Sequence, residues 1–175
     1  MKKDVTRLKN EDCLQLGAIL DTEGTHYRRL LRLAWRQNSY MQRQDVDRLE
    51  ANAREWARYL PLADEARIAR ERYVGELAAR NGLRIPPATV EDLLDYTNPQ
   101  TKQTVAGALG KVRRASAKLA RQNELNRLLA EFCLDLVHEE AEIFKSTVLK
   151  DPTGCYDEEA HNRGRGPGGV IVRQA

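Results

Sequence analysis

The chain has 175 residues and a formal net charge of +3, which is too small to identify a partner. Alanine, glutamate, lysine, leucine and arginine make up about half of it, a composition typical of long helices and coiled coils. Only 6% of the residues are aromatic, which argues against strands. The three cysteines form no paired motif, and no apolar run is long enough to span a membrane. We therefore expect an all-α protein in the cytoplasm.

Two long helices are predicted in the first half of the chain. The first covers residues 11–42, with Glu23 and Asn38 as polar intrusions on its apolar stripe, which contains Leu16, Leu20, Tyr27, Leu30, Ala34 and Met41. The second begins at an N-cap, Asp45, and its stripe contains Val46, Leu49, Ala53, Trp56, Leu60, Ala63, Val74 and Leu77. Because this phase continues beyond Pro61, we expect a kink there rather than a break.

A short helix and a third long helix follow. Thr89 and Asp92 predict a capping box at the start of residues 89–96, and the last helix is predicted from Pro99 to Lys150. The remainder is rich in glycine and charge, so we expect it to be flexible. The predicted fold is an elongated antiparallel bundle of three long helices plus one short helix, with a helical domain at 1–150 and a flexible tail at 151–175.

The charges of the last helix are segregated along its length. Residues 101–123 carry six bases and no acid, whereas residues 124–142 carry six acids and a single base, Arg127. This order is the reverse of what the helix macrodipole favours, so the stability of the helix itself does not explain it. Pairing with a neighbouring helix or a partner would explain it; the alternative is two solvated regions of opposite sign.

Two asparagines stand where this charge changes sign. Asn123 and Asn126 are three residues apart, and both fall in phase with Val105, Leu109, Val112 and Leu119. One interpretation is that they are buried and fix the register of the helix through an amide partner such as Asn38 or Gln37. The other is that they mark the point where the bundle opens to a bound partner.

No catalytic, metal or cofactor site is predicted. His138-Glu139-Glu140 lacks the second histidine of a zinc motif, and residues 164–169 lack the lysine and hydroxyl residue of a phosphate loop. Cys155, Asp157, Glu158 and His161 have no fixed geometry for a metal. The basic residues at 111–122 leave nucleic-acid binding as a weaker alternative, because a domain-wide basic footprint is missing. Another alternative is a structural, self-associating coiled coil.

The sequence "RQNELNRLLAEFCLDLVHEEAEIF" at 121–144, followed by "TGCYDEEAHNRGRG" at 153–166, resembles the FlgN family of flagellar export chaperones. The order of predicted helices over 11–165 is similar as well. The resemblance implies a cytoplasmic chaperone that uses no ATP or metal. Such a chaperone binds terminal segments of hook-filament junction proteins (the hook-associated proteins), prevents their early assembly and delivers them to the export gate.

The resemblance also implies particular site residues. Asn123 and Asn126 match the asparagine pair of the family, and Leu129, Phe132 and Leu136 match the apolar run after it. Val137 and Ile143 extend this apolar face, which would either pack on the other helices or bind a client helix. Tyr156 matches the tyrosine of the linker and is the candidate for docking at the export gate, although Cys155 beside it departs from the family pattern.

Overall fold

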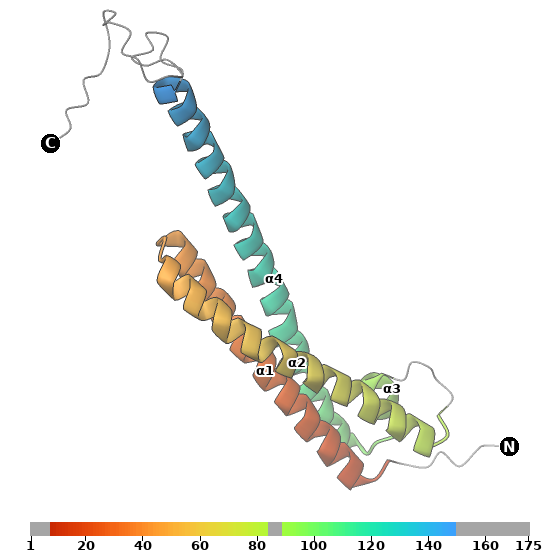
Figure 1. The fold of residues 1–175 in the computed structure, drawn as a ribbon. Coiled ribbons are helices and arrows are strands. Elements are labelled where there is room, and N and C mark those ends of the chain that lie inside the picture. Colours follow the sequence, from red (N-terminus) through yellow and green to blue (C-terminus); the bar gives the residue numbers. More distant parts are fainter. Residues whose placement is uncertain (1–7, 84–88, 150–175) are drawn as a thin grey trace, which may run out of the picture. The chain divides into compact units, whose positions relative to one another are not determined.

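The computed structural model describes residues 8–83 and 89–149, and all regular secondary structure in these residues is helical (Figure 1). The helices are α1 (Asn10–Gln42), α2 (Val46–Arg80), α3 (Val90–Leu94) and α4 (Pro99–Phe144), and a π-helical turn, η1 (Lys145–Leu149), follows α4. The described residues contain no strand, which confirms the all-α prediction. The chain divides into two compact units, residues 1–129 and 130–175.

The first unit is built from α1, α2, α3 and the part of α4 up to Leu129. α1 and α2 form an antiparallel hairpin, and α4 runs parallel to α1 (Figure 1). Hydrogen bonds fix this direction at both ends of α1. Asn98, next to the start of α4, donates to Asn10 over 2.9 Å, and Asn126 donates to the carbonyl oxygen of Ala34 over 2.8 Å. α4 is therefore antiparallel to α2, as expected for three long helices connected in sequence.

Two clusters of buried side chains hold this unit together. The larger one lies where all four helices meet, and its fully buried members include Leu16, Leu20, Leu77, Leu93 and Val105. The smaller one lies further along α1 and joins Leu30, Leu33 and Ala34 to Ala63 of α2 and Leu119 of α4. α3 contributes Val90, Leu93 and Leu94 to the larger cluster, so this short helix is held mainly by burial of its apolar residues.

The predicted helix boundaries and caps are largely confirmed. Asp45 caps α2 by accepting from the backbone N–H of Arg48, and Thr89 and Asp92 form a complete capping box on α3. The hydrogen bonds from Thr89 lower the pKa of the Asp92 carboxyl. α2 continues through Pro61 without a break and bends about midway along its length (Figure 1). α4 ends at Phe144, before the predicted Lys150, which lies outside the described residues.

The stripe predicted for the first half of α2 is partly wrong. Val46, Ala53 and Leu60 are exposed, whereas Asn52 is buried and donates from Nδ2 to the carbonyl oxygen of Leu33 over 3.2 Å. Tyr59, next to Leu60, packs on the smaller cluster. In a heptad pattern, the next inward-facing residue can stand three or four positions after the previous one. The prediction took the four-residue step, to Ala53 and Leu60, whereas contact with α1 selects the three-residue step, to Asn52 and Tyr59.

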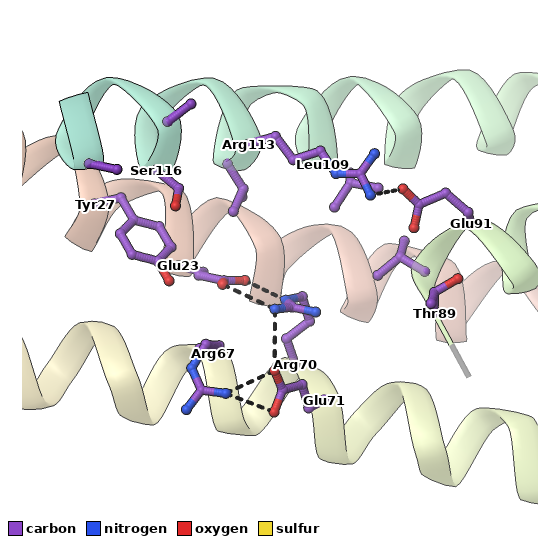
Figure 2. A pocket seen from close by; sticks show the side chains of 14 residues that line it. Glu23, Tyr27, Arg67, Arg70, Glu71, Thr89, Glu91, Leu109, Arg113 and Ser116 are labelled. Atoms are coloured by element: carbon purple, nitrogen blue, oxygen red, sulfur yellow. Dashed lines mark hydrogen bonds and ion pairs between the residues drawn. The ribbon is translucent and has the colours of Figure 1, made fainter. Parts of the chain in front are cut away.

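The polar intrusion at Glu23 is satisfied by an ion pair with α2. The Glu23 side chain is 1% exposed, and its Oε2 accepts from Nε of Arg70 over 2.7 Å (Figure 2). Tyr27 lies one turn further along α1, where burial, and then the charge of Glu23, raise the pKa of its hydroxyl. Since a buried carboxylate requires a compensating cation, this pair ties the register of α1 to that of α2.

We predict that Arg70→Met lowers the free energy of unfolding by about 3 kcal/mol, because it leaves the Glu23 carboxylate buried without its cation. Urea denaturation followed by circular dichroism measures this change. The matched control is Arg67→Met on the same helix. Arg67 pairs with the exposed Asp64 and Glu71, so its loss should change stability by no more than about 1 kcal/mol. Equal effects of the two variants would contradict the argument.

Candidate functional site

Asn126 lies on the buried face of α4 and makes a full set of hydrogen bonds. It is 4% exposed. Its Nδ2 donates to the carbonyl oxygen of Ala34 over 2.8 Å and to Oε1 of Gln37 over 3.0 Å. Its Oδ1 accepts from Asn38 and from Gln122, each over 3.0 Å. The interpretation of a buried amide with Asn38 or Gln37 as its partner is therefore confirmed for Asn126.

Asn123 is exposed, so the expectation that it shares the buried face is wrong. The buried residues of α4 are Val105, Ala108, Leu109, Val112, Ala115, Leu119 and Asn126. Four of these residues stand seven positions apart: Val105, Val112, Leu119 and Asn126. After Leu109, the buried residue between two of them stands three positions after the first, as Ala115 does after Val112, and not four. Asn123 stands four residues after Leu119 and so faces away. Its role in client binding stays a prediction.

The apolar stripe of α4 changes face at Asn126. Up to this point, a line of residues seven apart is buried and apolar: Val105, Val112 and Leu119. Asn126 continues this line, and after it the line becomes Cys133 and Glu140, both exposed. The line one position earlier holds Thr104, Lys111 and Lys118 in the first part of the helix and Leu125 and Phe132 in the second part. This second line is not required by the buried core.

The predicted client-binding residues beyond Asn126 are solvent-accessible. Phe132, Leu136, Val137 and Ile143 are 60%, 43%, 59% and 64% exposed, and Leu129 is half-buried. The alternative that the whole stripe is buried by packing is therefore wrong. Phe132, Leu136 and Ile143 share one face of the helix, because they are spaced by four and seven residues, and Val137 lies on an adjoining face. This exposed apolar stripe is the candidate interaction surface of the helix.

A hollow of about 650 Å³ lies where α1, α2, α3 and α4 approach one another (Figure 2). Its arginines are all paired with acidic residues of the chain. Arg70 pairs with Glu23, Arg67 pairs with Glu71, and Arg113 pairs with Glu91. As each cation has an acidic partner, the hollow offers no unbalanced charge to a ligand. We interpret it as a polar contact between the helices.

A second hollow, of about 400 Å³, is strongly basic. The lining residues from α1 are Arg28, Leu31, Arg32 and Trp35, and those from α4 are Lys111, Arg114, Ala115 and Lys118. No acidic residue lines it, and Trp35 is 51% exposed. The sequence showed the basic run of α4. It did not show that Arg28 and Arg32 of α1 lie beside this run, because that depends on which helices become neighbours.

The described residues show no arrangement suited to catalysis. They hold no group of three or more residues that could bind a metal. Cys13 is buried, and this burial, together with the charge of Asp12, raises the pKa of its thiol. None of the helices in the described ranges is long and apolar enough to cross a membrane. Tyr156 and the tail residues Cys155, Asp157, Glu158 and His161 lie outside the described residues.

The fold and this site define an all-helical protein whose last long helix packs into the core in its first part and exposes apolar residues in its second. Residues 15–164 match the FlgN protein family, and the chain belongs to that family. The family is one of flagellar export chaperones rather than enzymes. No curated protein and no solved structure matches the chain.

We predict that Asn126→Ala lowers the free energy of unfolding by about 1–3 kcal/mol, because Asn38, Gln37 and Gln122 lose their shared partner in a partly buried site. The matched control is Asn123→Ala, three residues away on the same helix but exposed, which should change stability by less than about 0.5 kcal/mol. Urea denaturation measures both. Similar losses in the two variants would show that the amide network does not carry the stability.

Proposed function

We propose that this protein binds terminal segments of hook-associated junction proteins in the cytoplasm, prevents their early assembly and delivers them to the flagellar export gate. Membership of the FlgN family supports the general role of an export chaperone. The observation that carries the proposal is the exposed apolar stripe of α4, which includes Phe132, Leu136 and Ile143. The helical core does not need these side chains, which leaves them available for another contact.

The physical basis of client binding is burial of two apolar faces. A terminal helix of a junction protein must expose an apolar face before assembly, and docking it on this stripe buries both at about 25 cal/mol per Å². Ordering a previously disordered segment opposes a large part of this gain, so the affinity is modest and release at the gate remains feasible. Asp135, Glu139 and Glu142 lie beside the stripe and favour a client helix with basic flanks.

The first test is client binding by variants of the stripe. Phe132→Asp and Leu136→Asp should each abolish co-purification with the terminal segment of a junction protein, because a charge placed in the contact opposes burial. Helicity should be retained, since both residues are exposed. The control is Leu14→Asp on α1, which introduces the same charge at a leucine that is 70% exposed. Unchanged binding by both stripe variants would refute the assignment.

The second test concerns docking at the export gate. Tyr156 lies outside the described residues, and its role is proposed from the family resemblance alone. Tyr156→Ala should leave client co-purification unchanged while reducing secretion of the junction protein into the medium. Tyr156→Phe is the matched control, since it keeps the ring that an apolar docking pocket would bind. Loss of client binding in Tyr156→Ala would place this residue at the client instead.

A further inference from the structure

The basic hollow between α1 and α4 gathers five cations within the first unit, residues 1–129. All five side chains are exposed: Arg28 and Arg32 on α1, and Lys111, Arg114 and Lys118 on α4. Successive members of each set are three or four residues apart, so each set forms a row along one side of its helix. The hollow thus lies between two rows of positive charge.

These charges are not balanced within the first unit. Among the residues that the structure describes, none of the five cations takes part in an ion pair. Arg28 donates to the hydroxyl of Thr25 over 2.9 Å, but this partner is neutral. The residues that line the hollow, all of them within the described ranges, include no acid. The cluster therefore attracts an anionic partner.

Trp35 stands at the same hollow and is 51% exposed. The other apolar lining residues, Leu31 and Ala115, are only 5% and 6% exposed, so Trp35 carries most of the apolar surface that the hollow presents to solvent. A tryptophan beside a cluster of cations suits the boundary between water and hydrocarbon, because its ring can enter apolar surroundings while its N–H stays hydrated.

Three kinds of partner carry the required negative charge, and a membrane surface fits best. A folded protein needs an interface whose centre is apolar and depleted of charge, whereas here cations surround one tryptophan. Nucleic acid favours a basic footprint over a whole domain, whereas this chain has a net charge of only +3. The three cations of α4 also cover only about 10 Å of helix. A bilayer with anionic lipids requires no more than a local cluster of about four to eight basic residues.

We propose that the face of α1 and α4 around this hollow binds the surface of a bilayer that contains anionic phospholipids. The planar guanidinium groups of Arg28, Arg32 and Arg114 bind headgroup phosphates, and the two lysines add positive charge. Trp35 inserts at the level of the headgroups. The inference goes beyond the proposed function and does not depend on it, because none of these residues belongs to the apolar stripe proposed for the client.

Cosedimentation of the full chain with vesicles measures this contact. The chain should pellet with vesicles of phosphatidylcholine that contain about 30 mol% phosphatidylglycerol at about 0.1 M NaCl, and stay in solution with phosphatidylcholine alone. Binding should be lost near 0.5 M NaCl, where the Debye length is only about 4 Å. A chain that does not bind the anionic vesicles, or that binds both kinds equally, would overturn the proposal.

Neutral substitutions test which face makes the contact. Each basic residue near an anionic surface raises the affinity on the order of fivefold, so the triple variant Arg32→Gln, Arg114→Gln, Lys118→Gln should bind these vesicles at least about thirtyfold more weakly. Helicity should be retained, since all three side chains are exposed.

The matched control for this variant is Arg43→Gln, Arg58→Gln, Arg72→Gln. It removes the same charge at exposed positions outside α1 and α4. Because salt screens charges that lie away from the contact, it should change the affinity by less than about threefold. Equal losses in the two triple variants would refute the assignment to this face.

Trp35 gives a direct readout of the contact. The chain has two tryptophans, so Trp56→Phe leaves Trp35 as the only one. Its emission should shift to the blue and become protected from acrylamide when anionic vesicles are added, because the ring leaves water. Emission that stays unchanged while the chain pellets would show that another face binds the vesicles.

Two competition measurements separate the bilayer from other anions. Sodium phosphate should displace the chain from the vesicles no better than NaCl of equal ionic strength, and stronger displacement would assign the hollow to free phosphate instead. Polyuridylic acid, at a phosphate concentration equal to that of the lipid, should leave most of the chain on the vesicles, because RNA offers no hydrocarbon layer to Trp35. Transfer of the chain to the RNA would overturn the proposal in favour of nucleic acid.

Discussion

The buried amide of Asn126 is the contact on which the arrangement of α4 depends. Its four hydrogen bonds reach Ala34, Gln37 and Asn38 of α1 and Gln122 of its own helix. A slip of α4 by one residue would move this amide off its partners and bring an exposed side chain into the buried face. Apolar packing alone tolerates such slips better, because one aliphatic residue can replace another. The amide therefore determines the register of α4, whereas the apolar contacts provide most of the stability.

A fixed register decides which residues of α4 are left for binding. Upstream of Asn126, the buried line is apolar and the neighbouring line is basic. Downstream, the same line continues as Cys133 and Glu140, which are exposed, and the neighbouring line becomes apolar at Leu125 and Phe132. The second part of α4 thus has an amphipathic face that the core does not use. One continuous helix thus contributes to the core in its first part and exposes apolar side chains in its second.

Much of this organisation could be predicted from the sequence, and the errors have one cause. Periodicity and capping residues predicted the helices, and Asn38 or Gln37 was predicted as the partner of Asn126. The misplaced residues were Asn123 on α4 and Val46, Ala53 and Leu60 on α2. In each case a heptad pattern allowed a step of three or four residues, and only the neighbouring helix determines which step faces inward. The pairing of Glu23 with Arg70, and the basic hollow, also depend on which helices become neighbours.

Phe132 shows how the binding surface is constrained. Its side chain is 60% exposed and shares one face of α4 with Leu136 and Ile143. Three acidic residues stand beside these apolar side chains: Asp135, Glu139 and Glu142. A pair of exposed charges adds little in water, whereas burial of an apolar face contributes in proportion to its area. The apolar side chains therefore determine most of the affinity that this face can offer, and the charges around them influence mainly which sequences it accepts.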